Sequence, residues 1–419
     1  MILQLAGHGA LRIKNAEDVM GGNFDIVIVG GGMVGSVLAH ALADDGWQVA
    51  VIEAAPQDSP SFDERVTALS EGSWRYLESL GLVTDRLRAH AQAIREVRVS
   101  QRGHPGLTRI GADEMGVAAL GRVTCNRALR EALESRPSWQ AVRRLEPARF
   151  VSFTMDDDSV RVTAQAGEEP LVLSARLLVA ADGVHSAVRE AAGLGARFHD
   201  YGQDAVIARV RPGRAHDGIA FEHFTDSGPL AVLPMTGGLC SVVLTVWRED
   251  SAQWQSLSDD EFARRLTARF GGRLGDLAAR PGRAVYPLGL SEVEQLTCGR
   301  VVLVGNAAHG LHPVAGQGFN LCLRDVRHLA DALRPARTAA DPARRHGDPG
   351  AAAPLARWAD GRRADHRRTV RLTDSLVGGF SGRSALAGRL LGPVRGLGLT
   401  MLDKCPPLKR GLARVTMGV

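Results

Sequence analysis

A strand, a glycine-rich turn and a helix follow one another near the start of the chain. Residues 24–29 form a short apolar run with β-branched side chains, which predicts a strand. Gly30, Gly32 and Gly35 come next with the spacing G-x-G-x-x-G, and residues 34–44 carry apolar side chains at helical spacing. Glycines in this pattern allow a tight turn, close approach of the backbone to a pyrophosphate, and packing of the helix on the strand.

A second strand and an acidic residue complete this unit. Residues 47–52 are again apolar, and Glu53 follows at the predicted strand end, 18 residues after Gly35. A carboxylate at this position can accept hydrogen bonds from a ribose. The unit therefore predicts a dinucleotide site rather than a purely structural glycine turn.

A second glycine-rich loop lies far along the chain, within residues 300–325. Val301–Val304 reads as a buried strand, the loop contains Pro313, Gly316 and Gly318, and a helix is expected to open near Phe319. A strand that feeds such a loop into a helix delivers unpaired backbone N–H groups to one point. Two loops of this kind in one chain predict a large cofactor that is held at both ends.

A third signal lies between the two loops. Residues 175–181 form an apolar strand, and Asp182-Gly183 follows before a helix that runs through Arg189. Asp-Gly alone predicts a turn. Between the other two loops, we expect it to close the same site with a carboxylate and a flexible backbone.

These three motifs, in this order, resemble the single-component FAD-dependent aromatic hydroxylases, the p-hydroxybenzoate hydroxylase group. Gly30–Gly35 matches the loop that binds the ADP part of FAD, and Asp182-Gly183 matches the family's Asp-Gly motif. Gly305–Gly318 matches the second flavin motif. Most members have Asp after its first glycine, where this chain has Asn306.

The resemblance narrows to the ubiquinone-biosynthesis hydroxylases. Residues 62–69 resemble their Asp-x-Arg-x-x-Ala-Leu segment, and residues 406–418 resemble their C-terminus. Residues 305–321 look closest to the 2-polyprenyl-6-methoxyphenol hydroxylase branch, where Asn is usual after the glycine. The resemblance implies bound FAD, NADH or NADPH as a transient reductant, and transfer of oxygen from a C4a-hydroperoxyflavin to a polyprenyl phenol.

The resemblance also implies roles for particular residues. Backbone groups of Gly316, Gln317 and Gly318 would face the pyrimidine edge of the reduced flavin, and Pro313 would form a wall beside its rings. Arg65 is a candidate partner of the pyrophosphate, because a guanidinium matches phosphate oxygens in pairs. The full set of expected cofactor-binding residues is Gly30, Gly32, Gly35, Glu53, Arg65, Arg122, Asn126, Asp182, Gly183, Gly305, Asn306, Pro313, Gly316, Gln317, Gly318 and Asn320.

No protein nucleophile or metal ligand is required, because the flavin performs the chemistry in this family. The catalytic residue is therefore left unassigned, with His312 on the flavin loop as the one candidate. His309, on the same loop, is expected to be structural. No metal is predicted. The five cysteines are scattered and include no Cys-x-x-Cys pair, which favours a reducing compartment.

The pattern of elements predicts an α/β fold, α+β overall. We expect a Rossmann-like FAD-binding domain, an inserted antiparallel substrate sheet, and C-terminal helices, because residues 205–247 alternate like antiparallel strands. Met20 stands before the first strand, which leaves open whether residues 1–19 are translated. The expected parts are a flexible extension (1–23), the FAD-binding domain (24–97, 120–195 and 288–334), the substrate domain (98–119 and 196–287), a flexible loop (335–354) and a helical region (355–419).

The C-terminal region is basic. From residue 355 onward 13 Lys or Arg stand against 4 Asp, whereas the whole chain has a net charge of +5. Leu372, Leu376 and Phe380 lie at helical spacing, so a basic amphipathic helix is predicted. It packs on the body of the enzyme, or it contacts anionic lipid or a protein complex of ubiquinone biosynthesis. We expect a cytoplasmic protein, peripheral on the inner membrane face, with no nucleic-acid partner.

Three functions fit these observations. The first is a flavin monooxygenase that hydroxylates a polyprenyl phenol in ubiquinone biosynthesis. The second is a hydroxylase of the same fold that acts on a soluble aromatic compound. The third is a flavin-binding assembly subunit without turnover. The sequence does not distinguish the ring position, the prenyl length, NADH from NADPH, or the oligomeric state.

Overall fold

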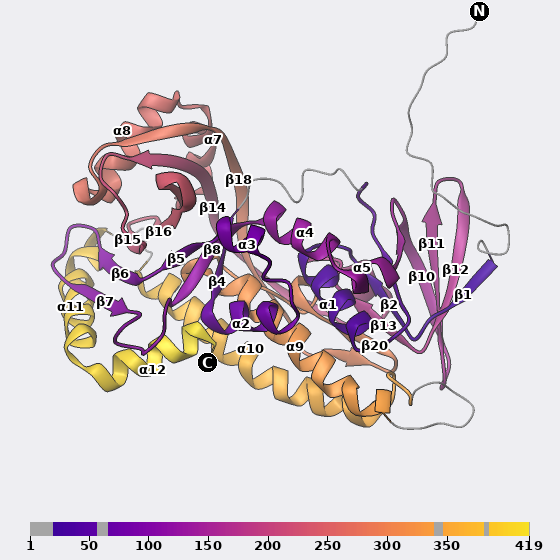
Figure 1. The fold of residues 1–419 in the computed structure, drawn as a ribbon. Coiled ribbons are helices and arrows are strands. Elements are labelled where there is room, and N and C mark those ends of the chain that lie inside the picture. The colour runs from indigo at the N-terminus through magenta and orange to yellow at the C-terminus, as the bar shows by residue number, and fades with distance from the viewer. Residues whose placement is uncertain (1–19, 57–65, 339–346, 381–384, 419) are drawn as a thin grey trace, which may run out of the picture.

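The computed structural model describes residues 20–56, 66–338, 347–380 and 385–418. A six-stranded sheet lies at its centre (Figure 1). In spatial order its strands are β19 (Thr297–Cys298), β20 (Val301–Leu303), β13 (Leu177–Ala180), β2 (Ile26–Val29), β3 (Val49–Ile52) and β9 (Arg143–Leu145). Neighbouring strands are parallel except for β19 and β20.

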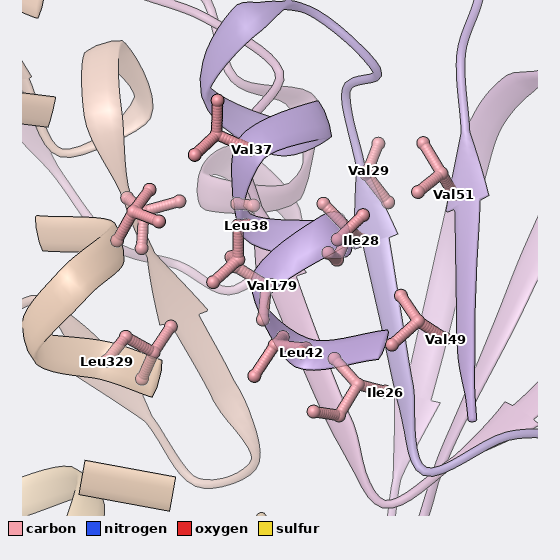
Figure 2. Close-up of a cluster of buried hydrophobic side chains, with 14 of the residues drawn as sticks. Ile26, Ile28, Val29, Val37, Leu38, Leu42, Val49, Val51, Val179 and Leu329 are labelled. Atoms are coloured by element: carbon pink, nitrogen blue, oxygen red, sulfur yellow. The ribbon is translucent and has the colours of Figure 1, made fainter. Parts of the chain in front are cut away.

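Helices cover this sheet, so its strands are apolar on both faces. Every residue of β2, β3 and β13 is buried. Helix α1 (Met33–Asp44) connects β2 to β3, and it packs against α9 (Gln317–Thr338). Figure 2 shows side chains of α1, such as Leu38 and Leu42, beside those of the strands and Leu329 of α9. The predicted Rossmann-like unit is therefore confirmed.

The parallel order brings the three predicted motifs to one edge of the sheet. The glycine turn follows β2, Glu53 follows β3, Asp182 follows β13 and Gly305 follows β20. These four strands are neighbours, and their carboxyl ends meet on the same side. In open α/β sheets this edge is where ligands bind.

A second sheet of eight strands is mainly antiparallel. Its spatial order is β21 (His309–Gly310), β18 (Leu277–Val293), β14 (Ala196–Pro212), β17 (Leu239–Trp247), β16 (Gly228–Met235), β15 (Ile219–Thr225), β6 (Glu96–Gln101) and β7 (Leu107–Gly111). Residues 205–247, predicted as antiparallel strands, form the end of β14 and all of β15–β17. A core with Trp254, Phe262 and Phe270 joins this sheet to the helices α7 (Arg248–Ser256) and α8 (Asp259–Phe270).

Two smaller sheets flank the larger ones. One contains β4 (Val66–Ser70), β8 (Gly121–Cys125) and β5 (Gln92–Ile94). The other contains β1 (Met20–Asn23), β12 (Glu169–Ala175), β11 (Val160–Ala166) and β10 (Arg149–Met155). The expected extension over residues 1–23 is therefore wrong for residues 20–23, which pair with β12. Backbone pairing of Met-Gly-Gly-Asn requires no alternation of side chains, so the sequence pattern did not reveal it.

The C-terminal helices are α10 (Ala352–Phe380), α11 (Ala385–Lys404) and α12 (Pro406–Met417). The expected loop over 335–354 is wrong at both ends, because α9 continues to Thr338 and α10 begins at Ala352. Residues 339–346 lie outside the described chain. The remaining helices are α2 (Glu71–Ser79), α3 (Asp85–Ala89), α4 (Asn126–Glu134), α5 (Pro137–Ala141) and α6 (Ala187–Ala191). Among the helices described, none is long and apolar enough to span a membrane.

Candidate active site

The glycines of the first loop are explained by close backbone packing. Gly30 has φ of +103°, and a Cβ there would lie 2.3 Å from the carbonyl oxygen of Ala181. A Cβ on Gly35 would lie 1.9 Å from the carbonyl oxygen of Gly30. A Cβ on Gly32 would have no neighbouring atom within 4 Å, so this side of the backbone is open to a ligand. The loop therefore combines tight packing on one side with an open face on the other.

Glu53 lies where the sequence placed it, beside the glycine loop. Its Oε2 accepts a hydrogen bond from the N–H of Gly31 at 2.6 Å, and its Oε1 accepts one from the N–H of Ala55 at 2.7 Å. Two backbone donors therefore fix the carboxylate at the end of β3. In this position it can also accept hydrogen bonds from a ribose.

The Asp182-Gly183 turn contains a polar atom that lacks a partner. The Oδ2 of Asp182 accepts a hydrogen bond from the N–H of Val188 at 3.2 Å. Its Oδ1 is buried and has no hydrogen-bond partner among the described residues. Such an atom costs stability unless a ligand satisfies it. The turn therefore fits a polar ligand that is bound at this edge.

Arg189 connects this turn to the second glycine loop. This role of Arg189 was not predicted from the sequence. It is buried, and its guanidinium donates to the carbonyl oxygens of Ala307 at 3.0 Å and Val184 at 2.9 Å. A basic residue two positions into a short helix gave no signal that it would point inward. Arg189 thus holds the two motifs at a fixed distance.

The second loop begins at Gly305, against the first loop. Gly305 has φ of +60°, and a Cβ there would lie 3.0 Å from Cγ1 of Val34. Asn306 is exposed, and its Oδ1 accepts a weak hydrogen bond from the thiol of Cys322 at 3.8 Å. The Asn306 amide is therefore directed to the open side of the loop.

A cavity of about 920 Å³ lies between these loops and the eight-stranded sheet. Its loop side is lined by Gly32, Met33, Gly183, Asn306, Pro313, Gly316, Gly318 and Phe319. Its sheet side is lined by Ala205, Ile207, Ala231, Val243, Tyr286 and Leu288. The cavity thus has backbone-rich motifs at one wall and a largely apolar sheet at the other. This fits a cofactor with a phosphate end and a flat ring end.

Residues 23–344 match the FAD binding domain family, which is most of the chain. The chain belongs to this family. Ubiquinone hydroxylase UbiL of Rhodospirillum rubrum is 38% identical over 398 residues, which are 94% of this chain and 89% of that protein. The 3-demethoxyubiquinol 3-hydroxylase of Escherichia coli K12 is 31% identical, over 94% of this chain and 98% of that protein.

Solved structures give the same fold. The p-nitrophenol 4-monooxygenase PnpA of Pseudomonas putida superposes with a TM-score of 0.72, at 20% identity, over 93% of this chain and 97% of that one. The expected membership in the FAD-dependent hydroxylases, in the group of the ubiquinone hydroxylases, is confirmed. The protein is an FAD-dependent monooxygenase that takes its electrons from NADH or NADPH.

Two expected FAD-binding side chains of this flavin hydroxylase are bonded to the protein itself. The Nδ2 of Asn320 donates to the carbonyl oxygens of Ala68 at 2.9 Å and Gly316 at 2.7 Å, while its Oδ1 accepts from the N–H of Ser70 at 2.8 Å. The Nε2 of Gln317 donates to the carbonyl oxygen of Thr416 at 3.2 Å. These side chains brace the flavin loop from behind, which leaves backbone groups to face the cavity.

Arg122 and Asn126 are also engaged elsewhere. Arg122 donates to Glu71 at 2.9 Å, and its guanidinium lies 4.5 Å from the centre of the Trp74 ring. The Oδ1 of Asn126 accepts a hydrogen bond from the hydroxyl of Thr67 at 2.7 Å. Neither side chain is among the residues that line the cavity. Arg65, the expected pyrophosphate partner, lies outside the described residues.

His312, the candidate catalytic residue, lies behind the flavin loop. It is 1% exposed, and its Nδ1 accepts a hydrogen bond from the N–H of Val314 at 3.3 Å. Burial lowers the pKa of His312 to about 4, so the ring is neutral near pH 7. The ring of Tyr201 meets its edge, with the centres 5.4 Å apart. Since His312 is also not among the cavity residues, this position favours a structural role.

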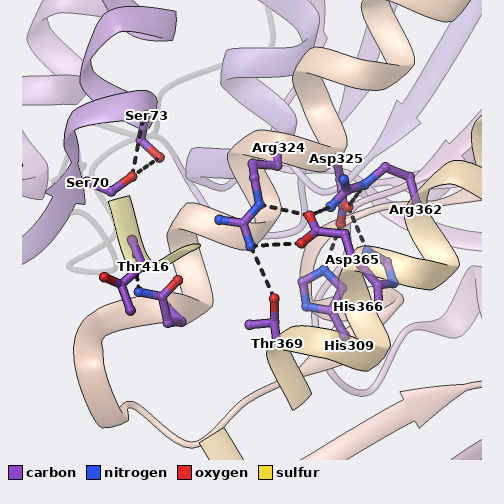
Figure 3. Close-up of polar contacts among 11 residues, drawn as sticks. Ser70, Ser73, His309, Arg324, Asp325, Arg362, Asp365, His366, Thr369 and Thr416 are labelled. Carbon is purple, nitrogen blue, oxygen red and sulfur yellow. Dashed lines mark hydrogen bonds and ion pairs between the residues drawn. The ribbon is translucent and has the colours of Figure 1, made fainter. Parts of the chain in front are cut away.

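A buried ion-pair network joins the flavin loop to α9 and α10 (Figure 3). Asp325 accepts hydrogen bonds from His309, His366 and Arg362, each at 2.7 Å. Burial alone would raise the pKa of Asp325, but the two histidines that face it hold it well below its usual range. His309 has its pKa lowered, because the cost of burial exceeds the effect of Asp325.

One ring nitrogen of His309, one of His366 and a carboxylate oxygen of Asp325 lie within 4.8 Å of one another, as metal ligands do. However, both carboxylate oxygens of Asp325 already accept short hydrogen bonds, and the guanidinium of Arg362 lies on one of them. A divalent cation there would meet a buried positive charge. We therefore interpret the cluster as an ion-pair network that fixes the flavin loop at His309.

Proposed function

We propose that this protein uses NAD(P)H and O2 to hydroxylate the aromatic ring of a prenylated phenol in ubiquinone biosynthesis, of the 2-polyprenyl-6-methoxyphenol type. Two relatives over nearly the whole chain are named as ubiquinone or demethoxyubiquinol hydroxylases, which supports the pathway. The observation that carries the proposal for the substrate is a second, apolar chamber next to the cofactor cavity.

This chamber has a volume of about 220 Å³ and lies between the sheet, the flavin loop and the C-terminal helices. Ala68, Leu233 and Gly316 line both the chamber and the cofactor cavity. A ring bound in front of the flavin can therefore extend a substituent into the chamber. The helices supply Leu372, Leu376, Leu399, Leu402, Leu412 and Met417, and the strands supply Val97, Val99, Ile110, Phe221 and Phe224.

The lining of the chamber selects against charged aromatic compounds. Among its described residues there is neither Lys nor Arg, and the one charged side chain is that of Glu222. The hydroxyl of Thr108 already donates to the carbonyl oxygen of Leu399 at 2.7 Å. Apolar surface of this kind favours a hydrocarbon chain, because burying such a chain removes it from water at little polar cost.

The protein contributes binding, orientation and exclusion of water. FAD, when bound, supplies the activation of O2 and the transfer of oxygen to the ring. Helix α9 begins at Gln317, so its unpaired N–H groups and positive dipole end lie at the cavity wall formed by Gly316 and Gly318. Negative charge on a reduced flavin ring would be stabilised there. The apolar sheet residues on the opposite wall keep water from the reacting ring.

A substitution that fills the chamber tests the substrate assignment. In Leu376→Trp the larger ring occupies space that a prenyl chain would take. We expect at least a tenfold rise in KM for a short prenylated phenol, with normal FAD content and normal NAD(P)H oxidation on a phenol without the chain. Val151→Trp, on an exposed position of β10, is the matched control. Equal loss with both phenols would contradict the assignment.

Quinone profiling of a deletion strain tests the pathway. We expect loss of ubiquinone and accumulation of a less hydroxylated prenylated precursor, both restored by the wild-type chain. Normal ubiquinone with no precursor would overturn the proposed pathway, and turnover of a soluble aromatic compound alone would then favour the second function.

A further inference from the structure

The outer faces of α11 and α12 expose a stripe of large apolar side chains. The stripe consists of Val394 (64% exposed), Leu397 (60%), Met401 (63%), Leu408 (62%) and Val415 (56%). Figure 1 shows α11 at the left edge of the molecule beside β6 and β7, and α12 below these strands. The spacing of Val394, Leu397 and Met401 places them on one face of α11, and that of Leu408 and Val415 places them on one face of α12. Large apolar side chains gathered on an exposed helix face mark an interaction site more often than a free surface.

The packing of α11 prevents the stripe from turning inward. A Cβ on Gly392 would lie 2.1 Å from Nε2 of His104, and one on Gly396 would lie 2.0 Å from the carbonyl oxygen of Pro105. The opposite face of α11 is therefore pressed onto the β6–β7 hairpin. The hydrogen bond from Thr108 to Leu399 fixes the same face.

Helix α12 is held in the same way. The ammonium group of Lys409, which is buried, lies 2.8 Å from the carboxylate of Glu114. The carbonyl oxygen of Thr416 accepts a hydrogen bond from Gln317 of the flavin loop. Leu408 and Val415 are consequently left on the outside. The contacts of the inner faces of α11 and α12 with the rest of the protein thus keep the stripe exposed.

The segment that carries the stripe has a net positive charge. Residues 392–418 contain five Lys or Arg and one acidic residue, Asp403. Lys404, Arg410 and Arg414 are exposed, while Asp403 already accepts a hydrogen bond from the backbone of Arg109 at 2.8 Å. Helices with one apolar face and flanking cations lie in the interface of anionic membranes. The positive charge therefore favours an anionic lipid surface, rather than a second copy of this chain, as the partner of the stripe.

We propose that α11 and α12 bind the surface of an anionic phospholipid bilayer through this stripe. Leu399, Leu402 and Leu412 on the same two helices line the apolar chamber. One helix layer would then separate the bilayer from the chamber, so a prenylated phenol enters from the membrane rather than from water. This link to the substrate rests on the function proposed above, whereas membrane binding itself does not.

Vesicle flotation with the FAD-loaded, full-length protein tests the proposal. Vesicles of phosphatidylglycerol and phosphatidylcholine are compared with vesicles of phosphatidylcholine alone, at low and at high salt. We expect binding to the anionic vesicles that high salt weakens. In L397S/M401S/L408S the partition coefficient should fall at least tenfold. In R410E/R414E binding should fall mainly at low salt. V151S/V172S, at exposed apolar positions on β10 and β12, is the matched control and should bind as the wild type does.

The readouts separate this proposal from the proposed function. FAD content and NAD(P)H oxidation with a detergent-solubilised prenylated phenol are measured in every variant, and they should not change in L397S/M401S/L408S. No wild-type binding to anionic vesicles at low salt would overturn the proposal. A wild-type dimer that the triple variant converts to a monomer would overturn it as well, because the stripe would then be a subunit interface.

Discussion

At the scale of single residues, the carboxylate of Asp182 is only half satisfied by the protein. Its Oδ1 is buried without a partner in the described parts of the chain. A bound cofactor hydroxyl that donates to this atom would remove a cost of about 1–3 kcal/mol. In Asp182→Asn an NH2 group takes the place of one carboxylate oxygen, and the remaining oxygen carries no charge. The side chain therefore accepts a weaker hydrogen bond from the cofactor or none, and we expect the Kd for FAD to rise about tenfold.

Fluorescence titration of the FAD-free protein measures this change. Asp156→Asn, at an exposed turn, keeps the same change of charge far from the cavity and should leave the Kd within about twofold. Unchanged FAD affinity in the Asp182 variant would show that Oδ1 is satisfied in another way.

The buried ring of His312 predicts a dependence of stability on pH. Its pKa is lowered to about 4 in the folded protein by burial, against about 6.5 in the unfolded chain. The unfolded state therefore binds a proton first as the pH falls. Stability from this residue is complete above pH 6.5 and declines between 6.5 and 4. We expect a loss of about 2 kcal/mol between pH 6.5 and 5.

Urea denaturation of the FAD-free protein at several pH values measures this loss. In His312→Asn an amide oxygen can still accept the hydrogen bond from Val314, but no group titrates. The difference between the wild type and this variant isolates His312 from other buried histidines. Parallel pH curves for the two proteins would show that His312 is not buried in its neutral form.

At the scale of elements, Asp325 connects three of them. It lies on α9 and binds His309 of β21 together with Arg362 and His366 of α10. Asp325→Asn removes one of the two carboxylate partners of the buried Arg362 guanidinium and leaves only Asp365. We expect a loss of about 1–3 kcal/mol in the free energy of unfolding, because charge-assisted hydrogen bonds to a buried carboxylate are lost. FAD retention should also weaken, because His309 lies in the flavin loop.

Chemical denaturation and flavin absorbance after gel filtration measure the two effects. Asp360→Asn removes an exposed partner of Arg363 on the same helix, and it should cost no more than about 0.5 kcal/mol. A double change of Asp325 and Arg362 to apolar residues should recover part of the stability, because the buried guanidinium that lost one of its two carboxylate partners is then removed as well. Equal effects of the Asp325 and Asp360 variants would contradict this interpretation of the network.

The elements that the sequence revealed are those with local periodicity. Strands β2, β3 and β13 are continuous apolar runs, and β15–β17 alternate, so their positions could be predicted to within a few residues. Strand β14 begins at Ala196, well before the predicted start at residue 205. Strand β1 and the parallel pairing of β6 with β15 could not be predicted, since they depend on contacts between segments far apart in the chain. The family's fold and cofactor were implied by the resemblance that the three motifs carry.

Individual side chains of the site were harder to assign than its loops. The glycines, Glu53 and Asp182 could be placed because backbone geometry at a strand end restricts them. Asn320 and Arg122 carry groups that suit a cofactor, but they face protein partners instead. The direction of a side chain depends on neighbours at distant positions, such as Ser70 for Asn320. These neighbours cannot be identified from the residues that lie close to Asn320 in the sequence.

At the scale of the whole molecule, the end of the chain closes the site. Walls of the apolar chamber come from β4–β8, from the eight-stranded sheet, from the flavin loop and from α10–α12. The last helix reaches back to α2, where a Cβ on Gly72 would lie 2.4 Å from the carbonyl oxygen of Gly418. The same helix holds the flavin loop through Gln317. The position of α12 therefore affects both the chamber and the cofactor cavity.

Gly72→Ala should displace α12, because backbone atoms of residues 417 and 418 have to move away. We expect a loss of about 1–3 kcal/mol in the free energy of unfolding and a higher KM for a prenylated phenol, with the FAD-binding motifs intact. Gly361→Ala, on an exposed turn of α10 with nothing within 4 Å, is the matched control. It should stabilise the protein by about 0.5–1 kcal/mol, as alanine does within a helix. If Gly72→Ala also stabilises the protein and leaves the KM unchanged, then α12 does not need this contact, and the chamber is closed by other parts of the chain.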